Sequence, residues 1–353
     1  MKNTAQFSLA WKSPSNIAFV KYWGKREGQL PANASLSMSL AEAYTKTQLI
    51  AFDAEEESPS LSLNGTTDHP FLSKIRILLE KMQIDFPILR SFDLALGTTN
   101  SFPHSTGIAS SASGMSAFAL CLLDLANQAK GIIPDEEAFF RQASYYARLG
   151  SGSACRSIYG GFTVWGKYPG LPFSDNEFAI PINEKVHPDF LKLQDAILIV
   201  SSKPKVMSSS EGHTRMNKHS FAYAREVQAE KNMENILLAL SQGDFDSLAS
   251  LSELEALTLH SLIMTSEGRD ILLEPGSLHI IHVVRNARKQ GLPVFFTIDA
   301  GPNIHLIYPE SHSTEVKSMI ENELLPYCED QKVIYDRCGN GPIRIPVLPG
   351  FIF

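Results

Sequence analysis

The chain has 353 residues, with 31 lysines and arginines against 38 aspartates and glutamates, so its formal net charge is −7. A surface that binds nucleic acid is usually basic, so this balance argues against a nucleic-acid partner. It does not exclude a small anionic ligand, because a pocket needs only a few local cations. Hydrophobic residues make up 44% of the chain and charged residues 20%, which is typical of globular proteins and disfavours disorder or a coiled coil.

The length exceeds what one hydrophobic core usually serves, so we expect two lobes with a cleft between them. No run of uniformly apolar residues is long enough for a membrane span. We also expect no secretory signal peptide. The four cysteines form no Cys-x-x-Cys pair, which favours free thiols in a reducing cytoplasm.

The first half of the chain begins with mostly β character. Turn-forming residues separate five short apolar runs, which predict strands at 7–11, 16–23, 35–40, 45–52 and 60–65. Apolar spacing predicts a helix over 71–82 and a strand over 91–99. An Ala- and Ser-rich segment predicts a long helix from 107 to about 131, and Pro134 suits the start of another helix over 134–149.

The irregular, proline-containing segment 167–188 marks the lobe boundary, so we expect lobes of residues 1–185 and 186–353. The second lobe is predicted to contain a strand at 195–200, a polar loop over 201–213, helices at 218–240, 245–264, 277–289 and about 314–325, a hairpin over 292–308, and two short final strands. Strands and helices in this mixed order indicate an α+β fold rather than a doubly wound parallel sheet.

A Ser/Gly-rich segment at 100–114 follows a predicted strand and opens the long helix. Gly107 lets the backbone approach a ligand closely, and free N–H groups at a helix start favour phosphate. The hydroxyls of Ser110, Ser111 and Ser113 could bind phosphate oxygens or a magnesium ion. The segment is not a Walker A loop, so phosphate binding and simple helix capping are equally supported.

The segment 13–27 concentrates positive charge, because Lys21, Lys25 and Arg26 lie within six residues. In an extended strand, Lys21, Lys25 and Trp23 would share one face and Tyr22 the other, unless the chain bends at the glycine between them. These cations favour a local anion site. The alternative is a solvated strand end, although the two aromatic residues weaken it.

A third segment, 150–161, surrounds Arg156 with small residues. A guanidinium is well shaped for bidentate contact with a carboxylate or phosphate, and Ser151 and Ser153 could donate further hydrogen bonds. An exposed arginine in a turn is equally supported by this segment alone.

Asp299 directly follows the apolar run at 295–298. A carboxylate held there is partly desolvated, which suits a general base or an orienting acceptor. The alternative, an aspartate that organises its own turn, is the more frequent one for Asp-x-Gly-Pro. His104, His213 and His260 fall near these segments, but no partner set indicates a Ser/His/Asp triad.

Taken together and in this order, the segments resemble the diphosphomevalonate decarboxylases of the GHMP kinase superfamily, over about residues 13–305. The motifs KYWGKR, GSGSACRSIYGG and DAGPN are specific to that family, whereas GIASSASG is shared more widely. The resemblance implies a two-lobe α+β fold, with a first lobe like domain 2 of ribosomal protein S5 and a ferredoxin-like second lobe. It also implies a cytoplasmic, homodimeric enzyme that uses ATP and Mg²⁺.

The activity implied is transfer of the ATP γ-phosphoryl group to the 3-hydroxyl of mevalonate 5-diphosphate, followed by loss of phosphate and CO₂ to give isopentenyl diphosphate. By the match, three residues are catalytic. Asp299 orients or deprotonates the hydroxyl, Lys21 lowers the pKa of that aspartate, and Arg156 holds the substrate carboxylate.

The remaining site residues are also carried over from the resemblance. Those implied to bind the substrate are Asn16, Tyr22, Lys25, Ser151 and Ser153. Those implied to bind ATP are Ser105, Gly107, Ala109, Ser110 and Ser111, with Ser111 as the magnesium ligand.

Three departures from the family pattern stand out. His104 and Ser105 are unusual before the serine motif, and His213 stands where methionine is more usual. The family's diphosphate-binding helix arginine aligns with Ser73, whose neighbours Lys74 and Arg76 could replace it.

The departures leave rival functions open. One rival is an enzyme that acts on the monophosphate or stops at the 3-phosphate ester, and another is a non-catalytic metabolite-binding protein. Retention of both Lys21 and Asp299 favours the decarboxylase.

Overall fold

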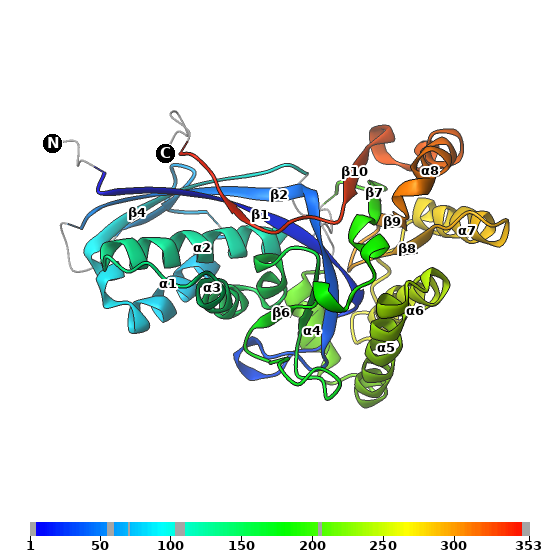
Figure 1. Cartoon of the computed structure of the whole chain (residues 1–353), viewed down its shortest axis with the longest axis horizontal. Helices are drawn as coiled ribbons and strands as arrows, with labels where there is room; N and C mark the ends of the chain where they lie inside the picture. Colours follow the sequence, from blue (N-terminus) through cyan, green and yellow to red (C-terminus); the bar gives the residue numbers. More distant parts are fainter. Residues whose placement is uncertain (1–4, 55–59, 70, 103–109, 204–206, 348–353) are drawn as a thin grey trace.

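The computed structural model describes residues 5–54, 60–69, 71–102, 110–203 and 207–347. The chain forms two lobes, each built on its own sheet (Figure 1). The sheet of the first lobe contains β1 (Phe7–Val20), β2 (Ser35–Asp53), β3 (Leu61–Leu63), β4 (Phe92–Asn100), β5 (Phe162–Trp165), β6 (Ala179–Pro181) and β11 (Ile343–Arg344). Its order is β11-β1-β2-β4-β3, with β5 paired to β2 and β6 to β5.

The first lobe has fewer and longer strands at its start than the sequence predicts. The run at 7–11 and residues 16–20 of the second run belong to one strand, β1, and the runs at 35–40 and 45–52 belong to β2. The prediction of separate short strands is therefore wrong. The register between β1 and β2 shifts between Pro14 and Asn16 and again between Ala18 and Val20, because bulges absorb the turn-forming residues without ending the strand.

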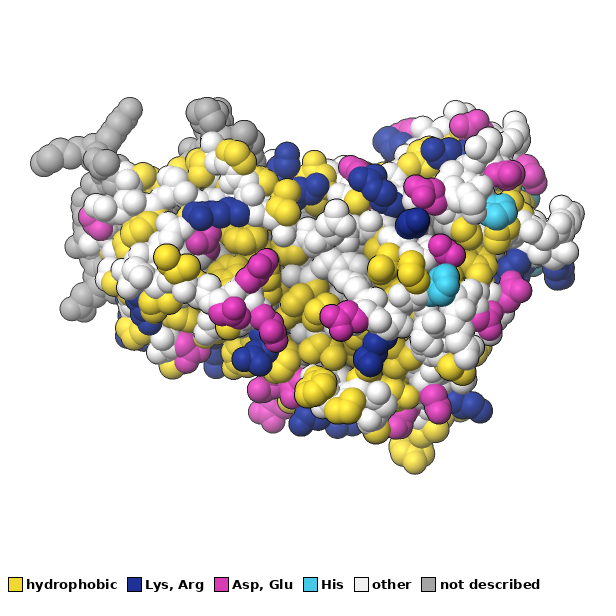
Figure 2. All heavy atoms as spheres, viewed as in Figure 1, with side chains coloured by type: hydrophobic (Ala, Val, Ile, Leu, Met, Phe, Trp, Pro, Cys, Tyr) yellow, Lys and Arg dark blue, Asp and Glu magenta, His cyan; other side chains and the backbone are white. Residues whose placement is uncertain are grey.

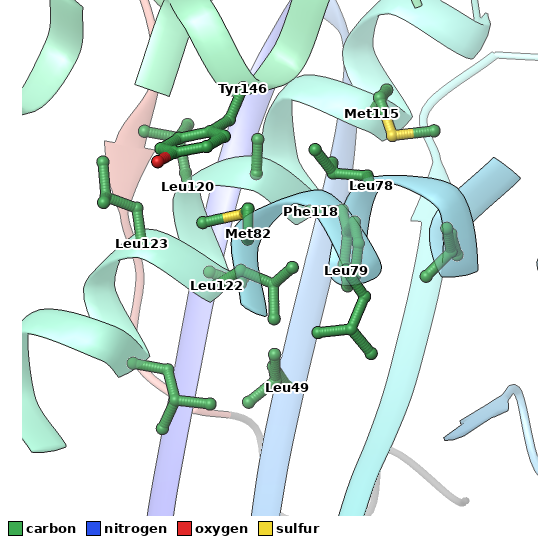
Figure 3. Close-up of a cluster of buried hydrophobic side chains, with 14 of the residues drawn as sticks. Leu49, Leu78, Leu79, Met82, Met115, Phe118, Leu120, Leu122, Leu123 and Tyr146 are labelled. Atoms are coloured by element: carbon green, nitrogen blue, oxygen red, sulfur yellow. The ribbon is translucent and has the colours of Figure 1, made fainter. Parts of the chain in front are cut away.

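Three helices cover one side of the first sheet, below the long strands in Figure 1: α1 (Leu72–Asp85), α2 (Ser110–Ala129) and α3 (Glu136–Gly150). Figure 3 shows Phe118 and Leu122 of α2 among Leu78 and Met82 of α1 and Leu49 of β2. The apolar length of α2 is thus explained by burial in this core rather than by a membrane.

The second lobe has a four-stranded antiparallel sheet in the order β10-β7-β9-β8. Its strands are β7 (Gln194–Leu198), β8 (Phe295–Thr297), β9 (Ile304–Tyr308) and β10 (Val333–Arg337). Its long helices are α5 (Ala222–Gln242), α6 (Phe245–Thr265) and α7 (Pro275–Lys289), and a short helix, α8 (Ser313–Met319), follows β9. The predicted hairpin is confirmed, because β8 and β9 pair antiparallel across the loop that contains Asp299. The mixed α+β, two-lobe prediction is also confirmed.

One predicted loop contains a helix. The segment 201–213 was expected to be irregular, but α4 (Ser209–Met216) begins inside it. The side chain of Ser208 caps this helix by accepting a hydrogen bond from the N–H of Glu211. The Ser-x-x-Glu spacing is a helix-start signal that the apolar pattern alone does not reveal.

A shared core joins the two lobes. Ile17 and Phe19 of β1 pack in one buried cluster with Met233 of α5 and Phe295 of β8. The end of the chain also returns to the first lobe, where β11 pairs with β1 at Trp11 and Lys12. The boundary between residues 185 and 186 stays a prediction.

The charged side chains on the surface and the state of the cysteines agree with the sequence analysis. Acidic and basic side chains are interspersed over the face in Figure 2. The four cysteines are free thiols, as predicted. Across the described ranges, no helix combines the length and the apolar character that crossing a membrane requires.

Candidate active site

An open cleft of about 570 Å³ is lined by residues of both lobes. The structure brings nine of the predicted site residues to its walls: Lys21, Tyr22, Lys25, Ser110, Ser111, Ser151, Ser153, Arg156 and Asp299. Ser105, Gly107 and Ala109 lie outside the described residues. The sequence segments chosen for their chemistry therefore converge on one site, although they are far apart in the chain.

The centre of the cleft holds an ion pair between the lobes. Lys21 follows the last residue of β1, and its Nζ lies 2.7 Å from Oδ1 of Asp299. The Lys21 side chain is 2% exposed and that of Asp299 is 27% exposed. Burial lowers the pKa of Lys21 below its ordinary value, and the negative charge of Asp299 opposes this shift. The carboxylate of Asp299 can therefore contact a ligand in the cleft, whereas the ammonium group of Lys21 is buried.

Lys21, Trp23 and Lys25 line one cleft, as predicted, and Tyr22 joins them because the chain bends at Gly24, the exception that the prediction allowed. β1 ends at Val20, and Gly24 has a φ of +96°, so the chain leaves the extended conformation where alternation was expected. The Tyr22 ring packs edge-on against Trp165, with ring centres 4.6 Å apart. Arg26 is not part of the cleft wall; it pairs with Glu226 at 3.1 Å on the surface.

Arg156 is a buried cation with neutral hydrogen-bond partners. Its Nε donates to Oγ of Ser37 at 3.0 Å and to Oδ1 of Asn16 at 3.3 Å, and a terminal nitrogen donates to Oγ of Ser35 at 2.8 Å. Burial lowers the pKa of Arg156. These partners orient the guanidinium without neutralising it, which leaves it able to bind an anionic group.

Asn16, predicted to bind substrate, lies behind Arg156 rather than on the cleft wall. It is buried, and its amide also donates to Oγ of Ser157 at 2.8 Å. Its observed contacts therefore orient Arg156.

A close approach at Gly152 shapes the wall that carries Ser151 and Ser153. A Cβ at this position would lie 2.8 Å from Trp165 and 2.9 Å from the hydroxyl of Tyr22. Only glycine fits such a gap without displacing the aromatic rings. The turn can therefore present both serines next to Arg156.

Hydroxyl groups line the cleft at two helix starts. Ser110 and Ser111 are the first residues of the 20-residue α2, and Ser208, Ser209 and Ser210 mark the start of α4. A long helix favours negative charge at its N-terminus, so the start of α2 suits phosphate.

Ser113, predicted to contribute a third hydroxyl, faces away from the cleft. It is fully buried, and its Oγ lies 2.7 Å from Oγ1 of Thr45 on β2. The prediction is wrong because this turn of α2 already packs against the sheet.

The structure distinguishes the two cations that could replace the family's helix arginine. Lys74 of α1 lines the cleft together with Ile77, one turn further along the helix. Arg76 instead donates to the backbone oxygen of Thr67 at 3.4 Å. Lys74 is therefore the better candidate for binding a terminal phosphate.

His213 supports the aromatic wall. Its Nδ1 accepts a hydrogen bond from the N–H of Gly24 at 3.0 Å, and its ring lies 4.1 Å from Tyr22 and 4.9 Å from Trp23 between ring centres. Burial, aided by the charges of Lys25 and Arg156, lowers the pKa of His213 to about 3. The imidazole is thus neutral at physiological pH.

A magnesium ion fits this site only as a partner of bound phosphates. Within the described part of the chain, no group of three His, Cys, Asp or Glu side chains is placed to hold a metal. Magnesium bound with phosphates needs only one or two protein oxygens, and the hydroxyl of Ser111 lies on the cleft wall.

The sequence did not reveal that Glu255 of α6 supports the ion pair, and it placed His260 of the same helix near the site without a role. The ring of His260 lies 3.1 Å from the backbone oxygen of Asp299, and Glu255 accepts the N–H of Lys21. Buried acidic and histidine side chains in the otherwise apolar helix α6 were the available signal.

Fold and cleft together define a class: a two-lobe α+β enzyme of the GHMP kinase type, with an anion-binding cleft around a buried Lys–Asp pair. The family model for the diphosphomevalonate decarboxylase-like N-terminal domain matches residues 13–170. The model for the mevalonate 5-diphosphate decarboxylase C-terminal domain matches residues 196–343.

Related proteins and solved structures indicate the same family as these models. A diphosphomevalonate decarboxylase of Ganoderma lucidum is 30% identical over 96% of this chain and 87% of its own, and one of Candida albicans is 31% identical over 89% and 88%. The complex of MDDEF with MVAPP, AMPPCP and magnesium has a TM-score of 0.80 and 29% identity, over 96% of this chain and 98% of that one. The mevalonate diphosphate decarboxylase of Staphylococcus aureus has a TM-score of 0.81 and 26% identity over the same shares, 96% and 98%. The chain belongs to the diphosphomevalonate decarboxylase family, and it is an enzyme of the carboxy-lyase class.

Proposed function

We propose that the chain decarboxylates mevalonate 5-diphosphate to isopentenyl diphosphate, with ATP and Mg²⁺, in isoprenoid biosynthesis. The observation that carries the proposal is the Lys21–Asp299 pair, 2.7 Å apart, in a cleft that also contains the buried Arg156. The related complex with MVAPP, AMPPCP and magnesium supports this choice of substrate and nucleotide.

In the first step, Asp299 orients or deprotonates the tertiary 3-hydroxyl of the substrate. Its carboxylate is partly exposed to the cleft, whereas Lys21 is buried. The positive charge of Lys21 favours the ionised form of Asp299. A carboxylate held in this way can accept the hydroxyl proton as the oxygen attacks the γ-phosphoryl group.

In the second step, the C3–O bond breaks and its electron pair leaves with phosphate, which takes back the proton from Asp299 and restores the negative charge of that carboxylate. The carbon that remains carries positive charge, which the nearby negative charge of Asp299 stabilises. The C1–C2 bond then breaks, its electrons form the C2=C3 double bond, and CO₂ leaves. Arg156 holds the substrate carboxylate in place for this step, and Asn16 orients Arg156.

The other cleft residues bind the two anionic substrates. Lys25, Tyr22, Ser151 and Ser153 contact the diphosphate or carboxylate end of the substrate, and Lys74 binds the terminal phosphate. We assign the ATP phosphates to Ser110 and Ser111 on the cleft wall. The family resemblance adds Ser105, Gly107 and Ala109, which lie outside the described residues. The hydroxyl of Ser111 would be the protein ligand of a magnesium ion bound with the phosphates, and the ion would neutralise part of their charge.

We also propose that the enzyme works as a homodimer in the cytoplasm. Family membership supports both statements, and the four free thiols agree with a reducing compartment.

The substrate class is tested by comparing mevalonate, its 5-phosphate and its 5-diphosphate in one assay that follows ADP and CO₂. We expect the highest kcat/KM for the diphosphate, and no turnover when EDTA removes magnesium. A preference for the monophosphate, or ADP formation without CO₂, would replace the proposal by one of the rival enzymes. Ligand binding with no turnover on any substrate would indicate a metabolite-binding protein.

A further inference from the structure

Side chains of the second lobe hold the backbone of Lys21 on both sides. Its N–H donates to Oε2 of Glu255 at 2.8 Å, and its carbonyl oxygen accepts a hydrogen bond from Arg225 at 3.0 Å. These residues lie 234 and 204 positions further along the chain. A lysine that only needs to present its ammonium group does not require its peptide groups to be fixed from another lobe.

Arg225 and Glu255, which hold the Lys21 backbone, form a buried ion pair that is joined by two hydrogen bonds. Two nitrogens of Arg225 donate to the two oxygens of Glu255 at 2.7 and 2.6 Å, and Asn232 donates to Oε1 of Glu255 at 2.6 Å. The side chains of Arg225 and Glu255 are 1% and 0% exposed. A buried ion pair contributes little net stability, because desolvation offsets the attraction. Stability alone therefore gives a weak reason for its presence.

Helix α6 contacts both members of the central ion pair. Glu255 fixes the backbone of Lys21, and five residues later on the same helix His260 contacts the backbone oxygen of Asp299 at 3.1 Å. The Lys21 and Asp299 backbones are thus held from one rigid element, although they come from different lobes.

We propose that Arg225 and Glu255 are positioning residues for catalysis, which hold the Lys21 backbone so that its ammonium group meets the carboxylate of Asp299 in the reactive geometry. This inference rests on the proposed function, in which that pair forms the reacting centre. Small displacements of a reacting group cost on the order of 100-fold in rate. The pair therefore acts on the chemical step and leaves substrate binding to the other cleft residues.

The pH dependence of activity separates the proposal from a purely structural role, because the charge of Glu255 acts on Lys21. The charged groups that act on Lys21 are Asp299 and Glu255, which raise its pKa, and Arg156, which lowers it; Arg225 adds a buried cation next to Glu255. Loss of the Glu255 charge lowers the pKa of Lys21 further. The alkaline fall in activity, where Lys21 loses its proton, then moves to lower pH.

The first test is Glu255→Gln, which keeps the size of the side chain and removes its charge. We expect kcat to fall about 10- to 100-fold, with KM for mevalonate 5-diphosphate and for ATP nearly unchanged and the alkaline limb shifted to lower pH. The matched control is Glu253→Gln on the same helix. Glu253 is also buried and pairs with Arg285 and Arg288 instead, so kcat and the pH profile should stay near wild type.

A second variant guards against misfolding, because Glu255→Gln leaves Arg225 buried without its partner. The double variant Arg225→Met/Glu255→Met removes both charges and keeps the volume apolar. We expect it to fold, with a similar loss of kcat. A folded double variant with wild-type kcat, a loss confined to KM, or failure of the double variant to fold would overturn the proposal. Wild-type enzyme assayed in parallel separates the two claims, because absence of CO₂ release there contradicts the proposed function itself.

Discussion

The cleft has two parts that differ in how firmly their charged groups are held. In the inner part, Lys21 and Arg156 are buried and held by hydrogen bonds, and Asp299, whose carboxylate is partly exposed, pairs with Lys21 and lines the same cleft as Arg156. In the outer part, Lys74 is exposed and Lys25 is half-buried. Bond making and breaking needs fixed geometry, whereas a lysine attracts phosphate as a mobile point charge. We therefore expect inner changes to affect kcat and outer changes to affect KM.

The largest effect is expected at Asp299. The variant Asp299→Asn keeps the shape of the side chain but can neither accept the hydroxyl proton as a base nor stabilise positive charge at C3. Loss of a general base costs about 10²- to 10⁴-fold, so kcat should fall by at least that range. Nucleotide affinity, measured by calorimetry with a non-hydrolysable ATP analogue, should stay near wild type. Activity within tenfold of wild type would remove Asp299 from its proposed role.

A smaller loss is expected for Arg156→Lys. The charge remains, but the forked hydrogen bonds to a carboxylate and to Ser35 and Ser37 are lost. Disrupting a buried charged contact costs about 2–5 kcal/mol, which corresponds to roughly 30-fold or more in kcat/KM. Steady-state kinetics with varied substrate would measure it. Kinetics equal to wild type would show that charge alone suffices in the inner part.

The smallest effect is expected in the outer part, for Lys74→Met. A hydrogen bond to a charged group contributes about 1.5–3 kcal/mol, so KM for the diphosphate should rise about 10- to 150-fold while kcat changes little. Arg76→Met is the matched control, since Arg76 contacts Thr67 instead. Equal KM values for the two variants would contradict the assignment of Lys74, and a large loss of kcat would remove the distinction between the two parts.

Local sequence patterns predicted most of the cleft wall, because its motifs combine residue types that are unusual next to one another. Two aromatic residues lie between Lys21 and Lys25, small residues surround Arg156, and Asp299 follows an apolar strand. The same patterns could not tell Arg26 from Lys25, or Arg76 from Lys74. Which cation enters the cleft depends on where β1 ends and on which side of α1 faces it, and neither is encoded in a short motif.

The sequence did not reveal which distant residues hold Lys21 and Asp299 in place. Glu255, Arg225 and His260 carry no motif, and their partners lie far away in the chain. Bulges likewise hid the length of β1 and β2, because Pro14 and its neighbours look like the end of a strand. Such features depend on tertiary contacts rather than on local propensity.

The most direct test of the account is a single-turnover experiment with excess wild-type enzyme, ATP, Mg²⁺ and mevalonate 5-diphosphate labelled at its carboxyl carbon. If the inner part performs both phosphoryl transfer and decarboxylation, then one ADP, one phosphate and one labelled CO₂ should form for each substrate consumed. Formation of ADP together with a stable 3-phosphate ester, and no labelled CO₂, would contradict it.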